Sequence, residues 1–175
     1  YGILPPLPAY CGNEGVGRVA SLGEGVEDIA VGQQVFLPVG AGTWRQQITA
    51  KAAEIVPVPP GTDPLQMAML TINPPTAYLM LRDFVRLEPG DWVIQNASNS
   101  GVGRYVIQLA AAQGAKSINI VRRAELADEL KAMGADAVVV EGPGMSKEVR
   151  EITGGAPVKL GLDAIGGDST LALGD

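Results

Sequence analysis

Two patterns of hydrophobic and polar residues follow one another along the chain. Up to Pro60, glycine and proline break up short apolar runs, and alternating stretches such as residues 17–20 and 34–37 are typical of strands in a small antiparallel barrel or sandwich. From Pro64 to Leu87 the pattern is helical. Residues 73–75 (Asn-Pro-Pro) predict a break and then a new helix, because proline starts a helix more readily than it continues one.

After a turn at residues 88–91, continuous apolar segments alternate with helical ones. The expected strands are residues 92–97, 117–121, 137–140 and 158–165, and the expected helices are 102–113, 124–133 and 145–152. Apolar strands that alternate with helices predict a parallel sheet with both faces covered. The expected fold class is therefore α/β, a partial β-rich domain followed by a doubly wound parallel sheet.

This pattern divides the chain into three segments. We expect residues 1–63 to form part of the β-rich domain, residues 64–90 to form linking helices, and residues 91–175 to form the doubly wound domain. A complete dinucleotide fold has about six strands. The chain supplies fewer, so we expect the sheet to be truncated and the chain to be the central part of a longer protein.

Charge and hydropathy narrow the possible partners. The chain has 13 basic and 19 acidic residues, a net charge of −6, and its lysines and arginines form no cluster. This balance disfavours nucleic acid or an anionic membrane as the main partner. There is no apolar run long enough to span a bilayer, and no signal segment follows Tyr1.

Cysteine and histidine usage excludes two kinds of site. The chain has one cysteine, Cys11, and no histidine. A Cys/His zinc site and a Ser-His-Asp triad are therefore both impossible within these residues, and we expect no metal. A single cysteine cannot form an internal disulfide, which favours a reducing compartment. We expect Cys11 to be a buried structural thiol.

The stretch "VIQNASNSGVGRYVIQLAAAQGA" predicts a nucleotide-binding turn between a strand and a helix. In the pattern G-x-G-x-x-G, serines replace the first two glycines, at Ser98 and Ser100, and their hydroxyls could bond a phosphate directly. Gly101 and Gly103 keep the backbone open where a helix N-terminus favours an anion. The alternative is a glycine-rich turn of any α/β protein.

The end of the next strand bears on which cofactor is bound. An NAD site places an acidic residue there, whereas this chain has Arg122 and Arg123. Guanidinium groups suit a 2′-phosphate, so the pair favours NADPH over NADH. The alternative is a solvated pair of surface arginines.

Five motifs together resemble a known family. In chain order they are "CGNEG", "GTWR", "NPPTAYLML", "PGDWVIQNASNSGVGRYVIQLA" and "INIVR". They are similar to those of the mitochondrial-type trans-2-enoyl-CoA reductases, a zinc-free branch of the medium-chain dehydrogenase/reductase superfamily. The resemblance implies a GroES-like catalytic domain followed by a Rossmann domain, with substrate and NADPH between them. It also implies reduction of trans-2-enoyl thioesters in fatty acid synthesis.

The resemblance assigns roles to individual residues. The family's catalytic tyrosine precedes a G-(L/I)-L-P-x-L-P stretch, which makes Tyr1, before "GILPPLP", the proton donor. Asn73 corresponds to an asparagine that contacts the cofactor near the nicotinamide. Asn99, Ser100, Gly101 and Val102 correspond to the pyrophosphate turn. The alternative for Tyr1 is a frayed terminal residue.

Two positions depart from related patterns. Arg122 corresponds to the arginine that binds the 2′-phosphate, but where the family commonly has Arg-Asp-Arg this chain has Arg122-Arg123-Ala124. Arg123 is the candidate replacement for the second guanidinium. Asn13 of "GNEG" occupies the place of a metal ligand in zinc-dependent relatives.

Two other functions remain open. A zinc-free NADPH:quinone reductase shares the fold and cofactor but needs no tyrosine proton donor. A non-catalytic NADPH-binding sensor would need neither substrate. The expected partners are a small enoyl thioester of coenzyme A or acyl carrier protein and, at full length, a second copy in a homodimer. We expect a cytoplasmic location in a bacterium, which is favoured, or the mitochondrial matrix in a eukaryote.

Overall fold

The computed structural model describes residues 7–174, which fall into two compact units that divide between Ile72 and Asn73. Tyr1 lies outside the described residues. The segment that we expected to link the domains is divided between the two units at Ile72 and Asn73. Among the described residues, no helix is long and apolar enough to cross a membrane.

The first unit contains a three-stranded antiparallel sheet in the order β1-β2-β3. Its elements are β1 (Val16–Arg18), β2 (Gln34–Phe36), a 3₁₀ turn (Ala52–Glu54), β3 (Val56–Pro57) and α1 (Pro64–Met67). Asp63 caps α1, since its carboxylate accepts a hydrogen bond from the N–H of Leu65 at 2.9 Å. The expected burial of Cys11 is wrong. Its side chain is exposed because it lies in a glycine-rich loop outside the sheet.

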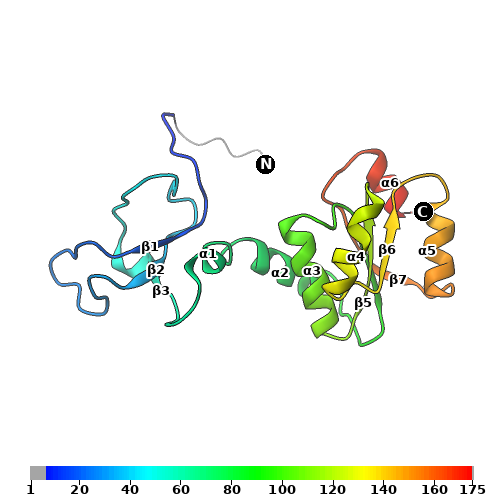
Figure 1. Cartoon of the computed structure of the whole chain (residues 1–175), viewed down its shortest axis with the longest axis horizontal. Helices are drawn as coiled ribbons and strands as arrows, with labels where there is room; N and C mark the ends of the chain where they lie inside the picture. Colours follow the sequence, from blue (N-terminus) through cyan, green and yellow to red (C-terminus); the bar gives the residue numbers. More distant parts are fainter. Residues whose placement is uncertain (1–6, 175) are drawn as a thin grey trace. The chain divides into compact units, whose positions relative to one another are not determined.

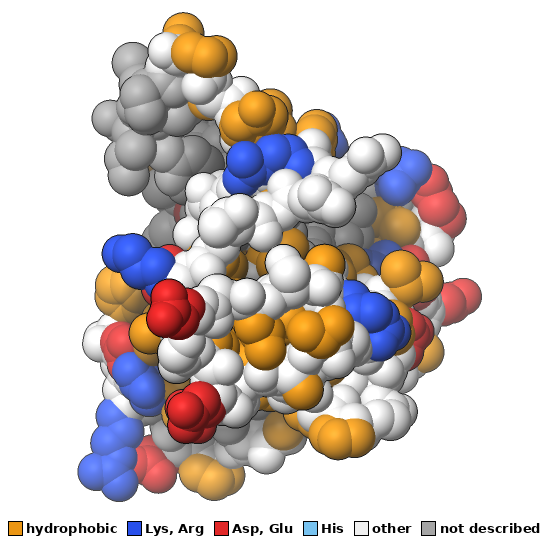
Figure 2. All heavy atoms as spheres, turned by 90° about the vertical axis from the view of Figure 1, so that its left-hand side faces the viewer, with side chains coloured by type: hydrophobic (Ala, Val, Ile, Leu, Met, Phe, Trp, Pro, Cys, Tyr) orange, Lys and Arg blue, Asp and Glu red, His pale blue; other side chains and the backbone are white. Residues whose placement is uncertain are grey.

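Side chains of different character are mixed on the surface drawn in Figure 2. Basic, acidic and apolar groups lie side by side on this face, without a large patch of one charge sign. Within the first unit, the guanidinium of Arg45 stacks over the ring of Tyr10 at 4.2 Å.

The second unit is a parallel sheet in the order β6-β5-β4-β7. Its elements are α2 (Asn73–Asp83), β4 (Trp92–Gln95), α3 (Gly101–Ala112), β5 (Lys116–Val121), a 3₁₀ turn (Ala124–Leu126), α4 (Ala127–Ala132), β6 (Ala137–Val140), α5 (Met145–Thr153), β7 (Val158–Leu162) and α6 (Asp168–Gly174). The order reverses direction between β4 and β7. This is the topology of a Rossmann sheet and confirms the predicted doubly wound class.

Helices cover both faces of this sheet (Figure 1). On one side, α2, α3 and α4 bury an apolar layer that includes Leu81, Val106 and Leu130. On the other side, α5 and α6 pack against an apolar layer of the strands that includes Ile94, Ile118 and Val139. Strands enclosed on both faces need apolar residues at successive positions, which explains their continuous hydrophobic runs.

Two glycines end the helices before β5 and β6. Gly114 follows α3 with φ +77°, and Gly134 follows α4 with φ +108°. Both values lie in the region that side chains with a Cβ avoid, so glycine stops each helix and turns the chain into the next strand. The sequence-based helix ends are therefore close to the observed ones.

The last expected strand is too long. We expected it to continue to Ile165, but β7 ends at Leu162. The carboxylate of Asp163 accepts hydrogen bonds from the N–H groups of Ile165 and Gly166 at 2.9 and 3.0 Å. These bonds close a turn in place of a strand, and the helix α6 that follows was not predicted.

Candidate nucleotide-binding site

The predicted turn lies at the carboxyl end of β4, where the strand order reverses. In open α/β sheets this edge is the usual place for a ligand. A cleft of about 500 Å³ opens there. It is lined by Asn96, Ala97, Asn99, Ser100, Ile120, Val121, Arg122, Glu141, Ala164 and Ile165. The structure thus brings three of the predicted residues, Asn99, Ser100 and Arg122, to one cleft.

The two serines of the turn serve different purposes. Ser98 is fully buried, and its hydroxyl lies 3.1 Å from the carbonyl oxygen of Gln95 and 3.0 Å from that of Ile120. This hydroxyl bonds the backbone, so the expectation that it could bond a phosphate is wrong for Ser98. Ser100 caps α3, because its oxygen accepts a hydrogen bond from the N–H of Gly103 at 3.1 Å.

The first turn of α3 presents free donors. Within residues 7–174, the N–H groups of Gly101 and Val102 have no hydrogen-bond acceptor, as is usual at a helix start. Two aligned N–H groups and the positive end of the helix dipole together favour an anion such as pyrophosphate. The geometry of the turn therefore suits the predicted role of Gly101 and Val102.

Space around the turn requires glycine at position 103, where backbone atoms lie close, and is limited at position 101, where a side chain lies close. A Cβ on Gly103 would lie 2.6 Å from the carbonyl oxygen of Ser98, closer than the backbone allows. A Cβ on Gly101 would lie 2.8 Å from the side-chain nitrogen of Asn73. Asn73, at the start of α2, therefore lies directly against the turn.

The turn also contains a strained residue. Ala97 has φ +47°, a left-handed conformation that alanine rarely adopts. It follows two buried polar residues, Gln95 and Asn96, at the end of β4. Such strain is often found where a chain is shaped for a ligand.

Below the turn lies a buried polar network that the sequence reading missed. The side-chain nitrogen of Gln95 donates to the carbonyl oxygen of Gly103 at 2.9 Å and to the amide oxygen of Asn119 at 2.7 Å. Asn119 in turn donates to Ser117 at 2.9 Å. The network joins β4, β5 and the start of α3. The sequence signal for this network was the presence of polar residues, Gln95, Ser117 and Asn119, inside otherwise apolar strands.

A second missed network crosses the point where the strand order reverses. The amide nitrogen of Asn96 donates to Asp163 at 2.5 Å and to Ser169 at 3.1 Å, and Ser169 donates to Glu141 at 3.0 Å. Thr170 also donates to Asp163. The hydrogen bonds from Thr170, Gly166, Asn96 and Ile165 hold the pKa of Asp163 well below its usual range.

The two arginines after β5 differ in their surroundings. Arg122 is exposed, lines the cleft and forms no ion pair within the described part of the chain. The Nε of Arg123 lies 3.7 Å from a carboxylate oxygen of Glu125, and Arg123 is not among the residues that line the cleft. Arg122 is therefore the better placed of the two to meet an anion.

Two residues of the "GNEG" motif, Asn13 and Glu14, hydrogen-bond to other segments of the first unit. A carboxylate oxygen of Glu14 accepts hydrogen bonds from the N–H and hydroxyl of Thr71 at 3.1 and 3.0 Å, and from the N–H of Ile72 at 3.1 Å. The backbone carbonyl of Asn13 accepts from Gly40 at 2.8 Å. Glu14 thus fixes the end of the first unit.

A larger hollow of about 640 Å³ lies elsewhere in the second unit, along α5, β7 and α6. None of the predicted site residues line it. Arg150 and the first residues of α5, Met145 and Ser146, line this hollow, but no residue of the predicted nucleotide turn does, so the smaller cleft is the candidate site.

Known families match both parts of the chain. The alcohol dehydrogenase GroES-like domain family matches residues 1–60, and the zinc-binding dehydrogenase family matches residues 101–174. The two matches have the order expected of a β-rich domain followed by a Rossmann sheet.

The chain is thus similar to the medium-chain dehydrogenase/reductase superfamily in both of its matched parts.

Within this superfamily, the similar proteins include enoyl thioester reductases. The mitochondrial enoyl-[acyl-carrier-protein] reductase of Rattus norvegicus is 44% identical over 99% of this chain and 48% of its own length. The Etr1p/NADP/crotonyl-CoA complex matches with a TM-score of 0.86 and 31% identity over 94% of this chain and 52% of that one. Another similar structure is the mitochondrial 2-enoyl thioester reductase heterodimer of Etr1p and Etr2p from Candida tropicalis.

Another solved structure of the superfamily has a different assigned activity. A Bacillus thuringiensis protein assigned as an NADPH:quinone reductase has a TM-score of 0.88 and 31% identity, over 99% of this chain and 53% of its own. The chain spans about half the length of the curated relatives it matches.

The donor set of this chain does not fit zinc, although one matching family is named for it. The sequence has no histidine and one cysteine. Within the described residues, no group of three or more cysteine, aspartate or glutamate side chains is arranged to hold a metal ion. The matched family name therefore gives no reason to assign zinc to these residues.

Proposed function

We propose that the complete protein reduces trans-2-enoyl thioesters with NADPH. The observation that carries the proposal is the cleft at the end of β4, which Ser100 and Arg122 line. In the described part of the chain, Arg122 has no ion pair and the N–H groups of Gly101 and Val102, directly after Ser100, have no acceptor, so the site offers two places for an anion. A pyrophosphate at the helix N-terminus and a 2′-phosphate at Arg122 match this arrangement. Similarity to enoyl thioester reductases supplies the substrate class.

The proposed roles follow from the chemistry of each residue. Ser100 keeps a hydroxyl proton that it can donate to a phosphate, because its oxygen acts as the acceptor toward Gly103. Asn99 forms the outer part of the turn. Asn73 lies against Gly101 and has an amide that can orient the nicotinamide end. Arg123 is proposed as a secondary contact for the 2′-phosphate, in competition with its pairing to Glu125.

Tyr1 is the proposed proton donor. When bound, NADPH supplies a hydride to the β-carbon of the enoyl thioester. The electron pair of the carbon–carbon double bond then moves toward the thioester oxygen, and negative charge develops there. The phenol of Tyr1 either gives its proton to the α-carbon, which completes the saturated acyl thioester, or hydrogen-bonds the enolate oxygen while water gives the proton to the α-carbon.

The domains, partners and location follow the same proposal. Residues 1–63 would form part of the catalytic domain, residues 64–90 the linking helices, and residues 91–175 the NADP-binding domain. The carrier would be coenzyme A or acyl carrier protein. The proposed partner is a second copy in a homodimer, in line with the two-subunit assembly that Etr1p forms with Etr2p. The compartment would be the matrix if the source is eukaryotic, as for the mitochondrial relatives, and the cytoplasm if it is bacterial.

An assay of the complete gene product separates the candidate functions. NADPH oxidation would be followed with crotonyl-CoA and with a benzoquinone in parallel, for the wild type and for Tyr1→Phe. We expect turnover of crotonyl-CoA, which Tyr1→Phe lowers by about 10²-fold or more. Turnover of the quinone alone, unaffected at Tyr1, would favour the quinone reductase, an alternative supported by the Bacillus thuringiensis structure. NADPH binding without turnover of either would favour a sensor.

A further inference from the structure

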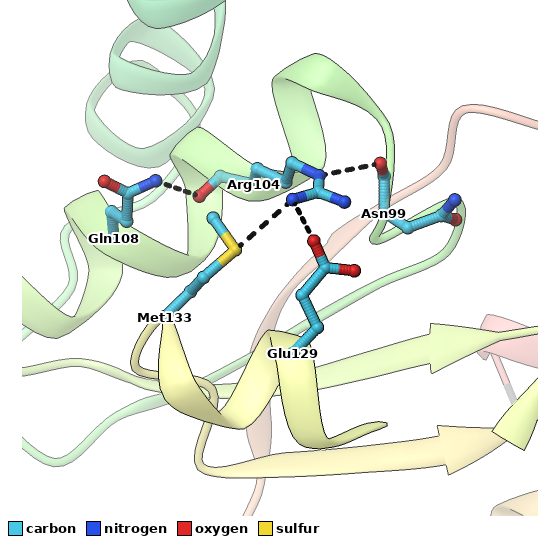
Figure 3. Close-up of polar contacts among 5 residues, drawn as sticks. All are labelled: Asn99, Arg104, Gln108, Glu129 and Met133. Carbon is cyan, nitrogen blue, oxygen red and sulfur yellow. Dashed lines mark hydrogen bonds and ion pairs between the residues drawn. The ribbon is translucent and has the colours of Figure 1, made fainter. Parts of the chain in front are cut away.

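One arginine next to the nucleotide turn contacts both the turn and the helix α4 of the second unit. Arg104 lies in the first turn of α3 (Figure 3). Its Nε donates to the carbonyl oxygen of Asn99 at 3.1 Å, and its Nη1 donates to the carboxylate of Glu129 on α4 at 2.6 Å. The same Nη1 lies 3.7 Å from the sulfur of Met133. One guanidinium thus joins the turn to a helix 25 residues further along the chain.

These contacts fix a particular peptide unit. The peptide between Asn99 and Ser100 is planar, so its carbonyl and its N–H point in opposite directions. The carbonyl is held by Arg104, and the N–H of Ser100 donates to the carbonyl of Ala97 at 2.9 Å. With both ends held, the orientation of this peptide is set immediately before the open N–H groups of Gly101 and Val102.

The turn needs such a support because its own sequence favours the required backbone conformation less than a glycine-rich turn would. Serines replace the first two glycines, and Ala97 is held in a strained left-handed conformation. The N–H groups that meet a phosphate act through direction as well as charge, so a turn that relaxes would bind less tightly. The ion pair to Glu129 leaves the guanidinium of Arg104 engaged with protein groups.

We propose that Arg104 is a positioning residue for the NADPH turn, anchored by Glu129 and acting through the Asn99 carbonyl. The proposal rests on the proposed function, in that it takes NADPH as the ligand of this turn. The rival role for Arg104 is a direct contact with the pyrophosphate. In that case the pairing with Glu129 would compete with the cofactor in place of supporting its site.

Substitution of Glu129 distinguishes the two roles by the sign of its effect. The dissociation constant of NADPH would be measured for the complete gene product and for Arg104→Gln, Arg104→Lys and Glu129→Gln. We expect Arg104→Gln to weaken NADPH about fivefold to tenfold and Glu129→Gln to weaken it about twofold to fivefold, since each removes a charge-assisted hydrogen bond. Arg104→Lys should also weaken binding, because an ammonium cannot reproduce the planar fork.

Two matched controls and a kinetic readout complete the test. Asp128→Asn removes a charge from α4 without touching Arg104, and Gln108→Ala removes the side chain that donates to the Arg104 carbonyl at 3.3 Å. Both should leave NADPH binding unchanged. In the Arg104 and Glu129 variants, the KM for NADPH should rise while kcat and the KM for crotonyl-CoA stay within about twofold. A purely stabilising ion pair would lower Tm alone.

Each result either supports or overturns the positioning role. Tighter binding of NADPH by Glu129→Gln, with Arg104→Lys equal to the wild type, would contradict it and indicate a direct phosphate contact. Unchanged NADPH binding in folded Arg104→Gln would also contradict it. If the wild type binds no NADPH, the proposed function itself fails, and this result is distinct from the other two.

Discussion

Two loops at the same edge of the sheet use their backbone N–H groups in opposite ways. The loop of residues 96–100, after β4, leads into α3 and leaves the N–H groups of Gly101 and Val102 without acceptors in the described chain. The loop of residues 163–167, after β7, leads into α6. There Asn96 accepts from the N–H of Ala164, and Asp163 accepts from the next two.

The loop of residues 96–100 can bind an anion from solution, whereas the loop of residues 163–167 already contains the carboxylate of Asp163. In the second loop, Asn96 and the carboxylate of Asp163 accept from the N–H groups of Ala164, Ile165 and Gly166, so these three donors are already bonded within the protein. In the first loop, the donors of Gly101 and Val102 have no such partner among the described residues. A helix N-terminus in itself therefore says little about a ligand. Whether its N–H groups already have acceptors within the protein is more informative.

The largest expected effect comes from closing the space in the first loop. Gly103→Ala would place a Cβ 2.6 Å from the Ser98 carbonyl oxygen, which forces the backbone apart. We expect the free energy of unfolding to fall by about 2–3 kcal/mol, measured by chemical denaturation of the complete gene product. Gly142→Ala, where a Cβ would meet nothing within 4 Å, is the control and should change it by less than about 0.5 kcal/mol. Equal effects would refute the steric argument.

The next effect concerns the charge beside the first loop. Arg122→Gln should raise the dissociation constant of NADPH about tenfold to a hundredfold, because a guanidinium–phosphate pair is lost. Binding of NADH should stay the same, since it has no 2′-phosphate. Arg123→Gln should have a smaller effect, because Arg123 lies near Glu125. Loss of NADH binding to the same extent would show that Arg122 supports the fold and not the phosphate.

A change in the second loop should depend on pH. Thr170, Gly166 and Asn96 lower the pKa of Asp163, so the folded protein favours the carboxylate. Its contribution to stability is full above the unfolded pKa of about 4 and is lost as the pH falls toward the folded value. Asp163→Asn should therefore lower Tm by a few degrees at neutral pH and progressively less below about pH 4. Asp168→Asn is the control. A difference in Tm that grows as the pH falls would contradict the assignment.

The smallest effect tests the strain in the first loop. Ala97→Gly should stabilise the protein by up to about 1 kcal/mol, since glycine tolerates φ +47° and the strain outweighs its entropy cost. Ala115→Gly, at a buried alanine without positive φ, should instead destabilise it by about 1 kcal/mol. If both substitutions destabilise equally, Ala97 is not strained.

The sequence predicted the second unit well because its signals are local. Continuous apolar strands and helices that end at Gly114 and Gly134 are properties of short segments. The end of β7 was missed because a side chain, Asp163, competes with the strand for the backbone N–H groups, and this depends on the three-dimensional position of Asn96 and Thr170.

The site was predicted only in part for a similar reason. The turn and Arg122 could be recognised from spacing, since strand, turn and helix are consecutive. The role of Arg104 could not, because its partner Glu129 is 25 residues away. The orientation of the Ser98 hydroxyl also depends on a neighbouring strand. Exposure of Cys11 was missed because the sequence does not reveal which loops lie outside the sheet.

The most direct test of the central claim is an NMR titration of the amide signals in the complete gene product with NADPH. The account predicts large shifts for Gly101 and Val102, which meet the pyrophosphate, and small shifts for Ile165 and Gly166, whose N–H groups remain bonded to Asp163. It also predicts a shift of the Arg122 guanidinium signal with NADPH but not with NADH. Equal shifts in both loops, or none at Gly101 and Val102 on saturation with NADPH, would contradict the claim that the turn after β4 is the cofactor site.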